Sequence, residues 1–167
     1  MRLPDVVHRI AEANAARYHL HPDGRAPMGG PEAVFQLLRE EMSCLPQEQL
    51  RVLLLDTRNR LTDVILVYQG TVDTQVVRPA EVLRPAVVVN APAIIVVHNH
   101  PSGDPTPSPQ DVALTKTLKA AADVMDIELV DHVVIGFERW ASLSDLGHLK
   151  RLTRIAARRR IGASGLV

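Results

Sequence analysis

The stretch from residue 93 to residue 124 constrains the fold of this chain more than any other. Residues 93–97 form a short apolar run rich in β-branched side chains, which predicts a buried strand in the centre of a sheet. The segment HPSGDPTP (residues 100–107) holds three prolines and a glycine, so neither a helix nor a paired strand can continue through it. Ser108 then has the form of an N-cap, with Asp111 at the third following position, which predicts a helix over about residues 109–124. We therefore expect a strand, a rigid loop and a helix in direct succession.

Helical and strand patterns alternate along the rest of the chain. Expected helices cover residues 4–17, a segment opened by Pro31, residues 79–90 and a last helix capped by Ser144, with a loop at residues 19–30. Expected strands cover residues 50–55 and 61–68, which form an antiparallel hairpin, and residues 71–78, 127–136 and 140–143. This alternation predicts an α/β (α+β) fold, a mixed β-sheet flanked by helices. We divide the chain into an N-terminal helical segment and linker (1–44), a domain (45–147) and a basic C-terminal helix or tail (148–167).

Composition excludes several classes of protein. Hydrophobic residues make up 46% of the chain but aromatic residues only 3%, so the core is built from Leu, Val, Ile and Ala. The single cysteine, Cys44, excludes an intrachain disulfide, a cysteine-based zinc cluster and the cysteine pair of the zinc deaminases. No segment has the pattern of a signal peptide or is apolar enough to span a bilayer, so we predict a cytoplasmic protein with no membrane partner. The net charge of +0 gives no general reason to expect nucleic acid as a partner.

The residues that carry chemistry are His98, His100 and Asp111. Residues i and i+2 of an extended segment point to the same side, so both imidazoles can reach one ion. Asp111, in the first turn of the following helix, can supply a third ligand. Two histidines and a carboxylate fit a catalytic zinc site, where the ion lowers the pKa of a bound water to about 7. A nearby carboxylate could then move a proton and the Ser108 hydroxyl could steady an oxyanion, although spacing alone leaves a hydrolase and a structural metal site both open.

The sequence HNHPSGDPTPS with Asp111 resembles the signature of RadC-type proteins of the JAB/MPN superfamily, the JAMM zinc metalloprotease motif. His98, Asn99 and His100 are followed by seven residues, then Ser108, two residues and Asp111. The resemblance extends over roughly residues 45–147. It implies a mixed sheet related to the cytidine-deaminase-like architecture, with His98, His100 and Asp111 as ligands of one Zn2+ ion and Ser108 as a group that helps bind the carbonyl oxygen.

The resemblance also implies a catalytic glutamate at the start of a strand ahead of the motif. Glu48 is the candidate, and Glu40, Glu41 and Glu81 are the alternatives. Two residues of the segment LVDHVVIG (129–136), namely Asp131 and His132, are expected to support the ligands or the fold rather than to bind the ion.

The function implied is a zinc-dependent hydrolase that cleaves a peptide or isopeptide bond with a zinc-activated water. The alternative is a DNA-repair-associated, RadC-like accessory protein that uses the zinc site for structure or binding, with nucleic acid contacted through the basic cluster at residues 150–160. The sequence departs from the family pattern in two ways. We find no N-terminal helix-hairpin-helix motif in this chain, which weakens the DNA-associated alternative, and Ala80 replaces the family's usual arginine. No motif identifies the peptide substrate or the oligomeric state.

Overall fold

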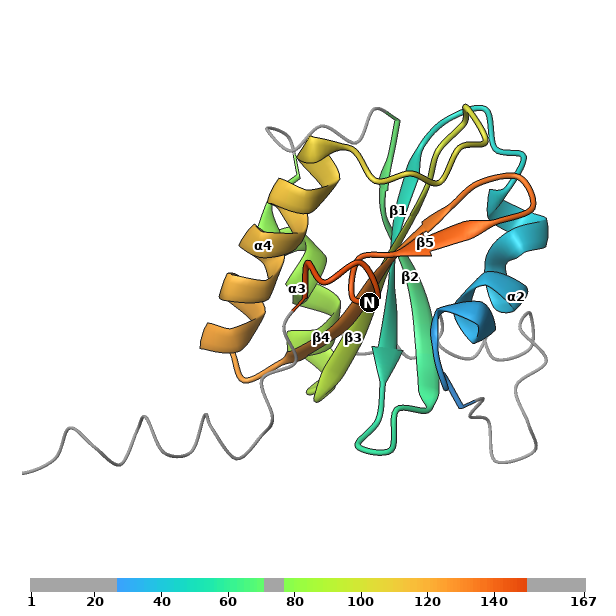
Figure 1. Cartoon of the computed structure of the whole chain (residues 1–167). Helices are drawn as coiled ribbons and strands as arrows, with labels where there is room; N and C mark the ends of the chain where they lie inside the picture. Colours follow the sequence, from blue (N-terminus) through green and yellow to red (C-terminus); the bar gives the residue numbers. More distant parts are fainter. Residues whose placement is uncertain (1–26, 71–76, 150–167) are drawn as a thin grey trace, which may run out of the picture.

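A mixed β-sheet with the strand order β2-β1-β3-β4-β5 runs through the centre of the protein (Figure 1). The computed structural model describes residues 27–70 and 77–149. The strands are β1 (Gln49–Leu55), β2 (Leu61–Gln69), β3 (Ala93–Asn99), β4 (Glu128–Ile135) and β5 (Trp140–Ser142). β3 and β4 are parallel, and the other neighbouring strands are antiparallel. The predicted mixed sheet and the predicted β1–β2 hairpin are therefore confirmed.

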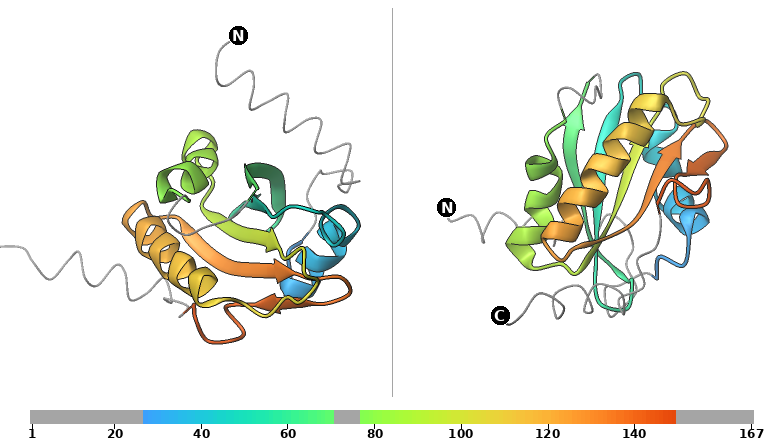
Figure 2. Two further views of the ribbon diagram at one scale, coloured as in Figure 1. Left: turned by 90° about the horizontal axis from the view of Figure 1, so that it is seen from above. Right: turned by 60° about the vertical axis from the view of Figure 1, so that its left-hand side comes forward.

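Helices cover both faces of this sheet. They are α2 (Pro31–Met42), α3 (Pro79–Val89) and α4 (Pro109–Val124). Each begins at a proline, whose fixed φ suits the first turn and whose missing N–H costs nothing there. Figure 2 shows α3 and α4 on one face and α2 on the other.

The alternation of side chains along β1 explains why the sheet needs both layers. Leu50, Val52 and Leu54 pack among residues of α3 and α4, whereas Leu53 and Leu55 pack among residues of α2. All seven residues of β1 and of β3 are buried. A strand buried on both faces is rich in apolar residues, and both segments are apolar except for Gln49 and Arg51 in β1 and His98 and Asn99 in β3.

β3 delivers the chain to one end of the molecule. It extends two residues beyond the predicted strand: His98 is paired with both neighbouring strands, and Asn99 is paired with Ile135 of β4. The chain then crosses over through α4 and returns in β4, parallel to β3. As a result the carboxyl end of β3 and the amino end of α4 lie at the same end of the molecule, at the top of Figure 1.

The prediction that Ser144 caps a helix is wrong for the part of that segment which the structure describes. Residues 143–147 form turns, in which the backbone N–H of Asp145 donates to the Ser142 hydroxyl and Gly147 adopts a φ of 82°. A glycine in the left-handed region ends a helical turn.

Three predicted features lie outside the described residues: the helix over 4–17, most of the strand over 71–78 and the basic cluster at 150–160. The two described residues of the predicted strand, Val77 and Arg78, are not in a strand. Among the described residues, no helix is long and apolar enough to cross a membrane.

Candidate metal centre

His98 and His100 present their Nε2 atoms to the same point. The two atoms are 3.0 Å apart, although one residue separates the two histidines in the chain. The His98 side chain is 1% exposed and that of His100 is 16% exposed. The predicted same-side arrangement of this pair is therefore present, with one imidazole at the base of the site and the other nearer to solvent.

Asp111 completes the group from the first turn of α4. Its Oδ1 atom lies 3.2 Å from His98 Nε2, and its Oδ2 atom lies 3.4 Å from His100 Nε2. The capping box predicted from the sequence holds it there. The Ser108 hydroxyl accepts from the Asp111 backbone N–H, and the Asp111 carboxylate accepts from the Ser108 backbone N–H at 2.7 Å.

The three side chains are close enough to hold one zinc ion. Ligand atoms at about 2.0–2.1 Å from such an ion lie about 3.3 Å from one another; the two nitrogens are 3.0 Å apart, and one Asp111 oxygen lies 3.2 Å from His98 and the other 3.4 Å from His100. The electrostatics also fit a cation. Burial raises the pKa of Asp111, but the neighbouring His100 and His98 side chains outweigh that effect and hold its pKa well below its usual value, so the carboxylate stays charged. The donor set therefore suits zinc in spacing, in charge and in the chemistry of its atoms.

The loop after β3 fixes which nitrogen of His100 is free. His100 Nδ1 donates to the Asp104 carbonyl oxygen at 2.8 Å, so Nε2 keeps the lone pair that a metal needs. The loop is itself held by side chains: the Asp104 carboxylate accepts from the backbone and the hydroxyl of Thr106, and the Ser102 hydroxyl accepts from the Asp104 backbone N–H.

A chain of buried hydrogen bonds does the same for His98. Thr115 donates its hydroxyl hydrogen to the Asp111 carbonyl oxygen at 2.6 Å, so its oxygen accepts from His132 Nδ1, also at 2.6 Å. His132 Nε2 is then an acceptor and takes the Nδ1 hydrogen of His98 at 2.8 Å. Burial lowers the pKa of His132 well below its usual value, which keeps its ring neutral. The result is a His98 whose Nε2 lone pair faces the site.

The sequence did not identify Thr115. The signal available was its position four residues after Asp111, which places both residues on the same face of α4.

Asp131 is not part of this group. Strand alternation places it on the opposite face of β4 from His132, and its carboxylate accepts from the Ser142 hydroxyl at 2.6 Å and from the Ser144 backbone N–H at 3.1 Å. It fixes the turn after β5 rather than the histidines. Of the two residues singled out in this strand, only His132 contacts a member of the metal group.

Of the candidate glutamates, Glu48 is the one whose charge acts on a histidine of the group. It immediately precedes β1, where Leu50 pairs with His98, and its charge contributes to raising the pKa of His100 after the larger effect of the hydrogen bond with Asp111. The alternatives lie elsewhere: Glu41 pairs with Arg51 at 2.7 Å, Glu81 accepts a hydrogen bond from the Tyr68 hydroxyl, and Glu40 is exposed on α2.

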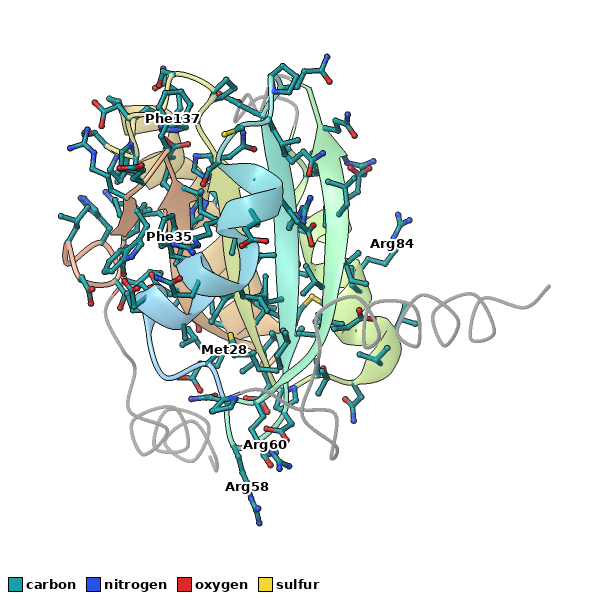
Figure 3. All side chains as sticks on the ribbon, turned by 90° about the vertical axis from the view of Figure 1, so that its right-hand side faces the viewer. Met28, Phe35, Arg58, Arg60, Arg84 and Phe137 are labelled. Carbon is teal, nitrogen blue, oxygen red and sulfur yellow. The ribbon has the colours of Figure 1, made fainter. Side chains whose placement is uncertain are left out.

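The loop that carries His100 packs closely on the turn between β4 and β5. The His100 backbone N–H donates to the Ile135 carbonyl oxygen at 2.9 Å, and the Gly103 carbonyl oxygen accepts from the Phe137 backbone N–H at 3.2 Å. Gly103 has a φ of 82° and faces the Phe137 ring. Arg58 lies in the turn between β1 and β2, and Figure 3 shows Phe137 at the opposite end of the molecule. A shallow open depression here is lined by Gly103, Phe137, Glu138 and Arg139.

This close packing predicts a loss of stability for Gly136→Ala. A Cβ atom at Gly136 would lie 2.3 Å from the Gly103 carbonyl oxygen, and backbone cannot move aside as a side chain can. We expect the free energy of unfolding to fall by about 1–3 kcal/mol, measured by urea denaturation. The control is Gly29→Ala, because a Cβ atom there meets no atom within 4 Å. Equal stability of the Gly136 variant and the wild type would show that the loop is not held at this contact.

Comparison with known proteins places this arrangement in a family. The model of the RadC-like JAB domain matches residues 28–148. A UPF0758 protein of Chloroflexus aurantiacus is 50% identical over 123 residues, which are 74% of this chain and 54% of the relative. UPF0758 proteins of Roseiflexus sp. and Caldanaerobacter subterraneus subsp. tengcongensis are 46% identical over 125 residues (75% of this chain, 54% of the relative) and 43% identical over 118 (71% and 51%). The chain thus spans about half the length of these curated relatives, and it belongs to the RadC-like JAB domain family.

Proposed function

We propose that this protein is a zinc-dependent hydrolase of the JAMM type, which cleaves a peptide or isopeptide bond. The observation that carries the proposal is the group formed by His98, His100 and Asp111, which brings two imidazole nitrogens and a carboxylate together at one end of the sheet. Three protein ligands leave one position for reactants, which distinguishes a catalytic zinc site from a closed structural one. Membership of the RadC-like JAB family supports the same proposal.

The protein's own residues divide the work around that ion. When bound, zinc supplies a Lewis acid that polarises a carbonyl group and activates water. His98, His100 and Asp111 would hold it, and the His132 ring fixes which nitrogen of His98 faces the site. The Glu48 carboxylate, whose charge acts on the His100 ring, would take a proton from the attacking water and pass it to the leaving amine.

Ser108 has a double role in this proposal. Its hydroxyl accepts from the Asp111 backbone N–H and donates to the Asp111 carboxylate at 2.7 Å. It therefore positions a ligand before substrate arrives, and turning its hydroxyl hydrogen towards a carbonyl oxygen costs it the bond to the carboxylate.

Glu48→Gln tests the proposal. Glutamine has the same size but cannot accept a proton, so we expect kcat for cleavage of peptide or isopeptide substrates to fall by roughly 100–10,000-fold. Bound zinc, measured by elemental analysis, should stay at one ion per chain because Glu48 is not a ligand. The control is Glu40→Gln on the exposed side of α2, which should leave both quantities unchanged.

Two results would contradict the proposal. The first is purified wild-type protein that takes up no zinc, which would remove the basis of the proposal. The second is wild-type protein that binds zinc but cleaves no member of an unbiased peptide and isopeptide library, which would indicate a structural or binding site.

The DNA-associated alternative depends on the basic cluster at residues 150–160, which lies outside the described residues. Salt-dependent DNA binding that disappears when residues 150–167 are removed would support that alternative.

A further inference from the structure

The buried amide of Asn99 lies between the two metal-binding histidines in sequence but bonds to a different part of the chain. Its Oδ1 atom accepts from the Gln49 backbone N–H at 2.8 Å, and its Nδ2 atom donates to the Gln47 carbonyl oxygen at 3.2 Å. The side chain is buried, with 1% of the residue exposed. Both hydrogen bonds reach across about fifty positions of sequence to the segment that precedes β1.

These two bonds bracket Glu48. The Gln47 carbonyl group lies in the peptide plane before the Glu48 Cα atom, and the Gln49 N–H lies in the peptide plane after it. Each plane is rigid, so fixing both planes fixes φ and ψ at Glu48. These two angles set the direction of the Glu48 Cα–Cβ bond. The second plane has a further anchor, because the Glu48 carbonyl oxygen accepts from the Gly70 backbone N–H at 2.9 Å.

We propose that Asn99 is a positioning residue that aims the Glu48 carboxylate at the metal centre. It follows His98 directly in β3, so the ligand strand and the glutamate segment are locked together by one side chain. The inference rests on the proposed function, because it assigns Asn99 a role through Glu48. It also explains why an amide is buried at the end of an otherwise apolar strand: one group must accept from one peptide and donate to the other.

Removing this side chain should not detach the strand. The Gln49 side chain is held independently, since its Oε1 atom accepts from Arg51 Nε at 3.1 Å and from Arg51 Nη2 at 2.8 Å. β1 also pairs along its length with both β2 and β3. A variant at Asn99 therefore keeps the sheet and the ligands while it frees the orientation of Glu48.

The test compares Asn99→Ala with Thr62→Val. Thr62 also donates from a side chain to the backbone of β1, at Leu54 O and 3.0 Å, but at the opposite end of the strand. For Asn99→Ala we expect one zinc ion per chain, a KM close to that of the wild type and a kcat lowered by roughly 100-fold. Hydrogen exchange at the Gln49 amide, followed by mass spectrometry of peptides covering 45–50, should become faster. Thr62→Val should change neither kcat nor exchange in that peptide.

Combination with Glu48→Gln separates positioning from general damage. If Asn99 acts through Glu48, Asn99→Ala adds no further loss to the residual rate of Glu48→Gln. Unchanged kcat or unchanged exchange at 45–50 in Asn99→Ala would overturn the inference alone, and so would a loss of zinc from this variant. Failure of the wild type to cleave any substrate would overturn the proposed function, and with it the assignment of Asn99.

Discussion

Replacing Asp111 with asparagine is expected to weaken zinc binding strongly. The carboxylate supplies the only full negative charge within the ligand group, and its two oxygens lie 3.2 Å and 3.4 Å from His98 Nε2 and His100 Nε2. A neutral amide cannot offset the charge of the ion and turns an NH2 group towards one of the histidines. The affinity, measured by competition with a chromophoric chelator, should fall by more than the roughly 10–100-fold that loss of an outer partner costs.

Asparagine removes the charge of Asp111 but keeps the helix cap. Its carbonyl oxygen can still accept from the Ser108 backbone N–H, and asparagine suits the start of a helix, so the unfolding free energy should fall by about 1 kcal/mol or less. Glu32→Gln is the matched control, because Glu32 is the acidic residue in the first turn of α2 and lies outside the metal group. Zinc affinity in Asp111→Asn equal to that of the wild type would exclude Asp111 as a ligand.

Thr115→Val is expected to weaken zinc binding although Thr115 touches no ligand nitrogen. Valine has nearly the same shape as threonine, but it leaves His132 Nδ1 without its acceptor in a fully buried place. His132 can then take the other tautomer, which puts a hydrogen opposite the Nδ1 hydrogen of His98. We expect zinc affinity to fall by about 10–100-fold and the unfolding free energy to fall by about 1–3 kcal/mol.

Thr117→Val is the control for this change. The Thr117 hydroxyl also donates to the carbonyl oxygen four residues earlier, at Ala113 and 3.0 Å, but it is exposed and bonds to no histidine. Thr115→Ser keeps the hydroxyl and should restore most of the zinc affinity. If Thr115→Val and Thr117→Val bind zinc equally well, the hydrogen-bond chain through His132 does not hold His98.

Local sequence was enough to predict most elements of the fold. Prolines at the start of α2, α3 and α4 mark where these helices begin, and the capping box at Ser108 is made by residues three positions apart. The apolar run in β3 predicted a buried central strand, and the one in β1 predicted a strand of a hairpin, which is how the two are placed. The prediction failed after Ser144, where Gly147 and bonds to the Ser142 hydroxyl favour turns over a helix.

The sequence by itself determined the metal group of this protein, because His98 and His100 share one face of a strand and Asp111 is held by its own helix cap. Only the tertiary structure decided what surrounds that group. Glu48 lies beside the strand end that carries His98 because β1 pairs with β3 in one register, with Leu50 opposite His98, and a shift of one residue would change its position relative to that histidine. Thr115, His132 and Asn99 gain their partners in the same way, from strands and a helix distant in sequence. The spacing of residues along the chain does not predict such pairings, because they depend on how the sheet and α4 pack together.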